Sequence, residues 1–172
     1  MKKLFAAFAV LAFAATAQAN DNTGKLGLGY QSSLAGGAGS WSVKYGIASN
    51  LTAQATIGAS FNKGDDNDPI AFGARVLYDI VEGENSDFYT GLGLRYEIQP
   101  DASTSLNGFG EDTIVVNVPL GFEFSLANAP AVAFSAEMGL NYTYGTNSKA
   151  WNLATVGGGL GTVFGAGAHY YF

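Results

Sequence analysis

Apolar and polar residues alternate with a period of two along most of this chain. The C-terminal stretch is a clear case, because reading back from Phe172 in steps of two gives Tyr170, Ala168, Ala166 and Phe164. The positions between them include Gly165, Gly167 and His169, so the two sets differ in character. Since side chains alternate between the two faces of a β-strand, this pattern predicts a strand whose faces meet different surroundings.

The same alternation, together with turn signals, predicts eight strands. They are residues 24–33, 40–48, 51–62, 70–81, 87–98, 112–124, 131–144 and 160–172. Each is long enough for the roughly 9–11 residues of a tilted strand that crosses a membrane. No stretch of the mature chain shows a convincing helical period.

The connections between these strands alternate in length. Those after the second, fourth and sixth strands are compact, at residues 49–50, 82–86 and 125–130. Those after the third, fifth and seventh are longer and more polar, at 63–69, 99–111 and 145–159, while the first, 34–39, is a short exception. Short turns on one side and longer loops on the other are typical of outer-membrane barrels. We therefore expect an all-β fold, an eight-stranded antiparallel transmembrane β-barrel with up-and-down meander topology.

The two faces of the predicted strands differ in charge. One face is apolar, as in Trp41, Val43 and Tyr45, and holds no charged residue. A Lys or Arg at the midplane of a lipid-facing wall costs roughly 2–4 kcal/mol, which accounts for this absence if the face meets lipid. The other face carries many glycines and the charged residues Lys25, Lys44, Arg75, Asp79, Arg95, Glu97, Glu123 and Glu137.

These four cations and four carboxylates predict mutual neutralisation inside the barrel. The interior of an eight-stranded barrel is just wide enough to be filled by side chains, and charges buried there must be paired. We expect a polar network that plugs the lumen, made by Lys44, Arg75, Asp79, Arg95, Glu97, Glu123 and Glu137. The alternative is a narrow or gated pore whose selectivity these residues set.

Residues 1–19 are predicted to be a cleaved secretory signal peptide. Lys2 and Lys3 precede an apolar run that is too short to cross about 30 Å of hydrocarbon, and Ala17-Gln18-Ala19 supplies a small-x-small cleavage site. Residues 20–172 then form the barrel domain, which has no cysteine and hence no disulfide. The net charge of −6, which becomes −8 without the two lysines, argues against nucleic acid as a partner.

The C-terminal strand resembles the assembly signal of bacterial outer-membrane β-barrel proteins, which runs polar, any, Gly, any, any, aromatic, any, aromatic. Gly167, Tyr170 and Phe172 match this pattern, and Gly165 stands where a polar residue is usual. In topology and face pattern the chain resembles the small eight-stranded barrels of the OmpA membrane-domain and OmpX type. The resemblance implies the outer membrane of a Gram-negative-type bacterium, contact with lipopolysaccharide, and recognition of the last strand by the barrel-assembly machinery.

Candidate chemistry outside the lumen network is sparse. His169 is the single histidine, and its position predicts a lumen site near the periplasmic end. In the resembling family, members that modify lipid A place a His and a Ser on the lipid side or at the outer rim. Asp65, Asp66 and Asp68 form an acidic loop that could bind a divalent cation weakly, although a solvated loop is the simpler interpretation.

The sequence therefore predicts a non-enzymatic protein of the bacterial envelope with outward-facing loops and no cofactor. A small-solute channel is the main alternative, and a lipid A-modifying enzyme is a third that the position of His169 disfavours. We also expect a monomer, because a closed barrel leaves no free strand edge that demands a partner.

Overall fold

The computed structural model of the protein describes residues 21–32, 39–59, 69–99, 110–155 and 165–172. Nine strands lie within these ranges. They are β1 (Leu26–Gln31), β2 (Ser40–Ala48), β3 (Leu51–Ala59), β4 (Ile70–Glu82), β5 (Ser86–Ile98), β6 (Thr113–Leu126), β7 (Ala129–Gly145), β8 (Trp151–Thr155) and β9 (Gly165–Tyr171). Within the same ranges, no helix is long and apolar enough to cross a membrane.

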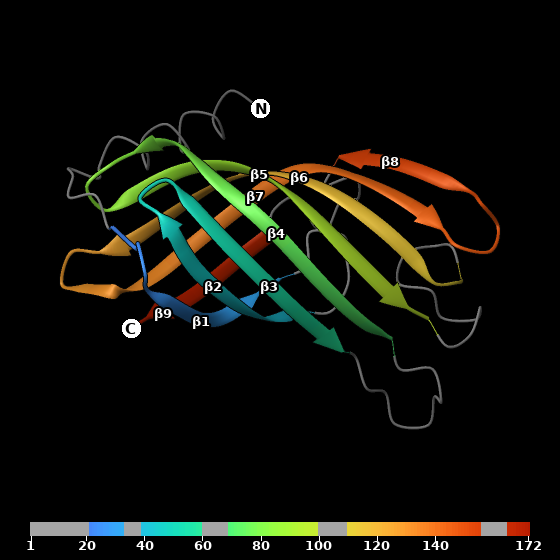
Figure 1. Cartoon of the computed structure of the whole chain (residues 1–172), viewed down its shortest axis with the longest axis horizontal. Coiled ribbons are helices and arrows are strands. Elements are labelled where there is room, and N and C mark those ends of the chain that lie inside the picture. The colour runs from blue at the N-terminus through green and yellow to red at the C-terminus, as the bar shows by residue number, and fades with distance from the viewer. Residues whose placement is uncertain (1–20, 33–38, 60–68, 100–109, 156–164) are drawn as a thin grey trace, which may run out of the picture.

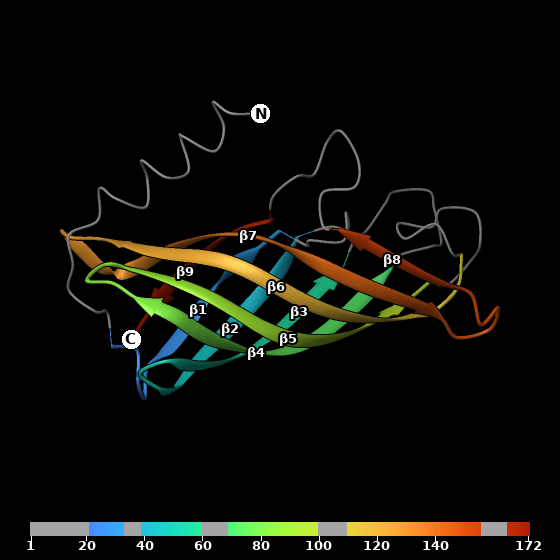
Figure 2. The same cartoon turned by 90° about the horizontal axis from the view of Figure 1, so that it is seen from above.

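The strands close into a barrel. β1 to β7 pair antiparallel in chain order. β9 pairs with β7 on one side and with β1 on the other, so the sheet returns to its first strand. Figures 1 and 2 show the resulting arrangement of tilted strands around one axis. The prediction of an all-β, eight-stranded antiparallel barrel with meander topology is confirmed.

The eighth position in the wall is shared by two strands. β8 pairs with one part of β7, starting at Leu140↔Thr155, and β9 pairs with the other part, ending at Glu137↔Gly165. Leu140 lies three residues after Glu137, whereas their partners lie ten residues apart. The chain between β8 and β9 therefore carries seven residues more than continuous pairing needs.

The prediction that residues 145–159 form one long loop is wrong. Trp151–Thr155 is a strand, and the connection from β7 to β8 is the short turn at residues 146–150. The part of β7 from Leu140 to Tyr144 needs a partner for its backbone N–H and C=O groups, which β8 supplies. Five alternating residues between polar and glycine-rich stretches are too few to stand out by pattern alone.

The other predicted boundaries hold closely. Those of the second to seventh predicted strands that fall on described residues agree with β2 to β7 within two residues. The predicted ends at 33, 60–62 and 160–164 lie outside the described residues, as does the signal peptide at 1–19. The connections at 49–50, 83–85 and 127–128 gather with the C-terminus at one end of the barrel, which we call the turn end (Figure 1). The opposite end, which bears the β7–β8 turn, is the loop end.

The barrel is apolar outside and polar inside. Exposed side chains on the strands are largely aliphatic or aromatic, among them Leu28, Trp41, Ile57, Phe72, Leu92, Leu120, Leu140 and Tyr170. Buried side chains are largely polar, among them Gln31, Lys44, Gln54, Glu97, Glu123, Glu137, Asn141 and His169. This distribution is the reverse of that in a water-soluble domain. The two faces read from the alternation are thus the outer and inner faces of the wall.

Glycines make room for long side chains inside this narrow barrel. A Cβ on Gly93 would lie 2.9 Å from Cβ of Arg75, which is its cross-strand neighbour. A Cβ on Gly27 would lie 2.8 Å from the ring of Tyr171, which is paired with it in the same way. Larger residues at these positions would collide with side chains that cross the lumen.

Candidate functional site: the polar lumen

Among the described residues, three ion pairs occupy the interior. Lys44 on β2 pairs with Glu123 on β6, on the far side of the lumen. Arg75 on β4 pairs with Glu137 on β7 through two bonds, Nη1 to Oε2 at 2.9 Å and Nη2 to Oε1 at 2.5 Å. The third pair lies within β5, where Arg95 Nη2 is 2.6 Å from Glu97 Oε1. The first two pairs each join opposite walls, so they cross the path that a solute would take.

Each of the two crossing carboxylates also accepts a hydrogen bond from a tyrosine. Tyr89 donates to Glu137 Oε1 at 2.5 Å, and Tyr171 donates to Glu123 Oε1 at 2.8 Å. The ammonium group of Lys44 lies 5.8 Å from the centre of the Tyr89 ring, which links the two pairs. The carboxylate of Glu137 is fully covered and would be costly to bury without these donors.

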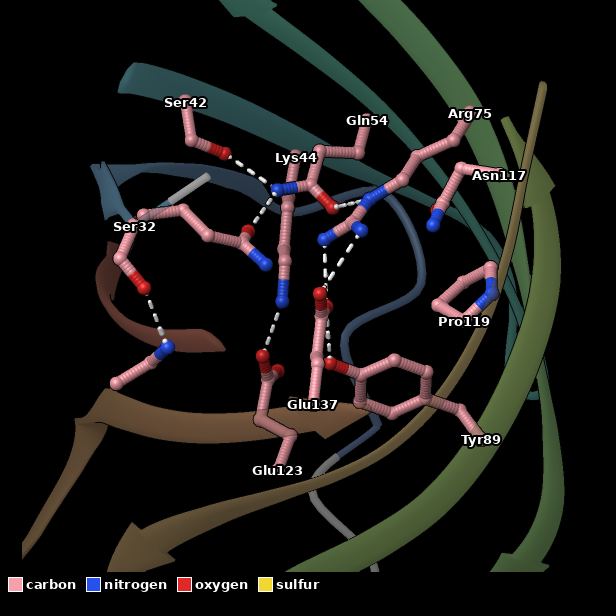
Figure 3. Close-up of polar contacts among 12 residues, drawn as sticks. Ser32, Ser42, Lys44, Gln54, Arg75, Tyr89, Asn117, Pro119, Glu123 and Glu137 are labelled. Atoms are coloured by element: carbon pink, nitrogen blue, oxygen red, sulfur yellow. Dashed lines mark hydrogen bonds and ion pairs between the residues drawn. The ribbon is translucent and has the colours of Figure 1, made fainter. Parts of the chain in front are cut away.

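Gln54 on β3 connects the arginine to the wall formed by β1 and β2. Its Nε2 donates to Gln31 Oε1 and to Ser42 Oγ, each at 2.6 Å, and its Oε1 accepts from Arg75 Nε at 2.6 Å. Figure 3 shows this chain running across the barrel from Ser42 through Gln54 and Arg75 to Glu137 and Tyr89. All the polar atoms of the amide are thereby used to hold the guanidinium group in place. We call this set of side chains, together with Lys44, Glu123 and Tyr171, the lumen plug.

His169 lies in the lumen wall beside the plug, on β9. Its Nε2 is 2.8 Å from Ser42 Oγ, and its Nδ1 has no hydrogen-bond partner in the described part of the chain. Ser42 Oγ also accepts from Gln54, so its own proton is available for the histidine. Both side chains are almost completely buried, and neither lines a cavity described below. The His–Ser pair therefore packs the lumen wall.

Two cavities lie on either side of the plug. The one toward the loop end measures about 70 Å³ and is lined by Thr56, Arg95, Asn117 and Asn141, among others. The one toward the turn end measures about 20 Å³ and is lined by Thr52, Asp79, Asp87 and Glu123, among others. Thr52, Gln54 and Thr56 follow one another on the inner face of β3, so one strand passes from cavity to plug to cavity.

The structure brings six of the seven predicted network residues together as pairs. These are Lys44, Arg75, Arg95, Glu97, Glu123 and Glu137. Asp79 lies instead in the small cavity at the turn end. The alternation could not reveal the two tyrosines as members of the plug, because aromatic residues occur on both faces. The available signal was that Tyr89 alternates in step with Gly91 and Gly93 on β5, and Tyr171 with His169 on β9.

A second cluster of carboxylates orders the loop end. Glu111 accepts hydrogen bonds from the backbone N–H groups of Asn147 and Ser148 and from the Ser148 hydroxyl. The Ser148 hydroxyl is the main reason that the pKa of Glu111 is lowered, with the two backbone donors adding to it. Asp112 accepts from Tyr96 OH at 2.8 Å and from the backbone N–H of Gln99 at 2.9 Å. These bonds tie the β7–β8 turn and the end of β5 to the start of β6.

The remaining predicted residues lie apart from the lumen chemistry. Tyr170 and Phe172 both point outward at the turn end, with ring centres 5.4 Å apart. Gly167 faces inward, where a Cβ would lie 2.6 Å from Ser135 Oγ. Asp65, Asp66 and Asp68 lie outside the described residues. Among the described residues, no group of three or more His, Asp or Glu side chains could hold a metal ion.

The comparisons with known proteins bear on the fold alone. No protein-family description matches the chain, and no curated protein matches it by sequence. Among solved structures, the chain is similar to the N-terminal β-barrel domain of OprF from Pseudomonas aeruginosa, with a TM-score of 0.51 and 15% identity. The match covers 91% of this chain and 100% of that one. The chain thus has the fold of an OmpA-type eight-stranded barrel.

Proposed function

We propose that the chain is an integral protein of the bacterial outer membrane whose barrel is closed to solutes and has no enzymatic activity. The observation that carries the proposal is the lumen plug, in which two ion pairs cross the barrel between cavities of about 70 Å³ and 20 Å³. The apolar outer wall supports insertion in lipid, because a wall without charged side chains suits hydrocarbon. The likeness in fold to the OprF barrel domain is consistent with this role.

Conductance across a planar bilayer tests the closed lumen. We expect the purified protein to show no stable openings, because ions would have to displace buried, paired side chains. Stable wild-type openings that shift in size in Arg75→Gln or Glu137→Gln variants would establish the small-solute channel instead. Glu82→Gln is the matched control, because Glu82 is exposed at the turn end and takes no part in the plug.

Labelling from the hydrocarbon phase tests membrane insertion. The chain has no cysteine, so single cysteines can be introduced without background. Leu140 and Asn141 are neighbours on β7 that face outward and inward, respectively. In lipid vesicles, a membrane-soluble thiol reagent should label Leu140→Cys and spare Asn141→Cys. Equal labelling of both, or of neither, contradicts a lipid-facing outer wall.

The remaining parts of the proposal follow from the resemblance. Residues 1–19 act as a cleaved export signal, Gly167, Tyr170 and Phe172 are recognised during barrel assembly, and the loop end faces lipopolysaccharide. The buried His169–Ser42 pair supports a non-enzymatic role, since neither side chain is accessible. Mass analysis of lipid A from cells with and without the protein tests this. A change in acyl chains would contradict it.

A further inference from the structure

The two lumen cavities differ in the charge of their linings. The cavity at the turn end is lined by three carboxylates, those of Asp79, Asp87 and Glu123, and by one cation, Lys44. The cavity at the loop end is lined by two arginines, and no Asp or Glu is among its described lining residues. The loop-end cavity is therefore the one that suits a negatively charged ligand.

The two arginines of this cavity are neighbours across β4 and β5. Arg75 is paired with Gly93, and Arg95 is paired with Gly73. The arginines are thus diagonal neighbours, whose backbones lie roughly 7–8 Å apart. Gly73 and Gly93 line the cavity as well, and they leave it open because neither carries a side chain.

The carboxylates that balance these arginines lie outside the lining. Glu137 pairs with Arg75 and Glu97 pairs with Arg95, and neither carboxylate lines the cavity. A guanidinium group carries five N–H donors. Gln54 and Glu137 accept from three of those of Arg75, so two remain for a further acceptor. Because the arginines are already paired, a ligand here is held by hydrogen bonds as well as by charge.

Two buried amides in the lining add further donors. Gln31 and Asn141 are only 4% and 6% exposed. The oxygen of each already accepts a bond, Gln31 Oε1 from Gln54 and Asn141 Oδ1 from Asn117. Their amide nitrogens are thus the ends left to donate, and a buried donor needs an acceptor from water or from a ligand.

We propose that the loop-end cavity binds a small oxyanion such as phosphate. Its volume is about 70 Å³. One water needs about 10–15 Å³ of such space, so the four oxygens of a tetrahedral oxyanion fit. Arg75, Arg95, Gln31 and Asn141 supply donors, and the oxygen of the Asn117 amide, whose nitrogen is already used, can accept from a protonated phosphate oxygen. Water could satisfy the amides too, but it offers the neighbouring arginines no negative charge.

The site needs the barrel but not its closure, so it can be absent while the proposed function stands. Equilibrium dialysis with radiolabelled inorganic phosphate tests it, using the folded protein in micelles of a detergent without phosphate. We expect saturable binding that approaches one phosphate per chain. Arg95→Gln with Glu97→Gln removes an ion pair without changing the net charge and should weaken binding about tenfold. Thr56→Val removes a lining hydroxyl at nearly constant shape and should weaken binding about threefold.

Lys149→Gln is the control for binding at the surface. Lys149 is an exposed cation in the β7–β8 turn and does not line the cavity, so its loss should leave phosphate binding unchanged. Binding that falls equally in this variant, or that lipid A displaces from the micelles, would place the anion on the outer surface and overturn the site. Absence of saturable binding to the wild type would show that water alone fills the cavity. If the Arg95 variant does not fold, unchanged binding by Thr56→Val with a wild-type urea midpoint overturns the site as well.

Discussion

Removing the charge of Glu137 should destabilise the barrel strongly. Its side chain is fully covered and that of Arg75 is only 11% exposed, so the Glu137→Gln variant leaves a guanidinium charge in the lumen without its counter-charge. Breaking a buried ion pair by removing one partner costs about 3–5 kcal/mol. The same variant also turns an amide N–H₂ group toward Arg75 or Tyr89, which are both donors to the native carboxylate.

Urea unfolding of the protein in lipid vesicles measures this cost. The two tryptophans, Trp41 and Trp151, both lie on the outer wall, so their fluorescence changes when the barrel leaves the lipid. For a slope of about 2 kcal/mol per molar urea, the midpoint should fall by about 2 M. The exposed Glu82→Gln exchange makes the same chemical change and should shift stability by less than about 0.5 kcal/mol.

A double variant separates burial from pairing. Replacing both partners by apolar residues, as in Arg75→Met with Glu137→Leu, removes the charges together and should cost less than Glu137→Gln alone. The Tyr89 hydroxyl and Gln54 then lose a partner, at about 1–3 kcal/mol for each group that stays dry. A cost below about 1 kcal/mol for Glu137→Gln would refute the reasoning, because that is the value of an exposed pair.

Three further outcomes follow from the contacts of individual side chains. Tyr89→Phe and Tyr171→Phe each remove a hydroxyl donor to a buried carboxylate and should each lower the unfolding free energy by about 1.5–3 kcal/mol in the same urea assay. Gly121→Ala places a Cβ against the Tyr89 ring and should cost about 1–3 kcal/mol, whereas Gly24→Ala, where no atom lies within 4 Å, tests only the positive φ of 74°. Because the folded pKa of Glu111 is lowered, its contribution to the β7–β8 turn is present above its ordinary pKa of 4.5 and is lost as the pH falls through the lower, folded value. Protection of the Asn147 and Ser148 amides against hydrogen exchange, measured relative to the intrinsic rate at each pH, should therefore fall in acid, and Glu111→Gln should show the same loss of protection at neutral pH.

The sequence predicted the faces of the strands well because a charged residue on the outer face costs free energy at each position independently. A charge on the lipid side is costly wherever it occurs, so the alternation marks the face of Arg75 or Glu137 without any knowledge of its neighbours. The alternation does not show where along the barrel axis a residue lies. Arg75 and Glu137 lie 62 residues apart, and only the register of the intervening strands brings them together. The sequence could therefore predict that the lumen charges form ion pairs, but not which residue pairs with which.

The elements that the sequence did not predict depend on short or cooperative features. β8 is five residues long, and its strand character comes from the unpaired part of β7 beside it. Glu111 was predicted as the end of a polar loop and Asp112 as the first residue of a strand, although their carboxylates organise the β7–β8 turn and the start of β6. Capping of this kind needs the turn to be in place already, so no local pattern reveals it.

Whether this barrel is closed or acts as a small channel depends on the free energy needed to open the lumen. A path through the lumen requires the Arg75–Glu137 and Lys44–Glu123 pairs to separate or exchange partners. If separating the first pair alone costs about 3–5 kcal/mol, the open fraction lies between about 1 in 100 and 1 in 10,000, since each 1.4 kcal/mol is a factor of ten. Brief, rare openings then fit the same plug that blocks steady flow. The larger the loss of unfolding free energy in Glu137→Gln, the rarer the openings of the wild-type barrel should therefore be. A barrel that conducts freely although this loss is large would contradict the relation.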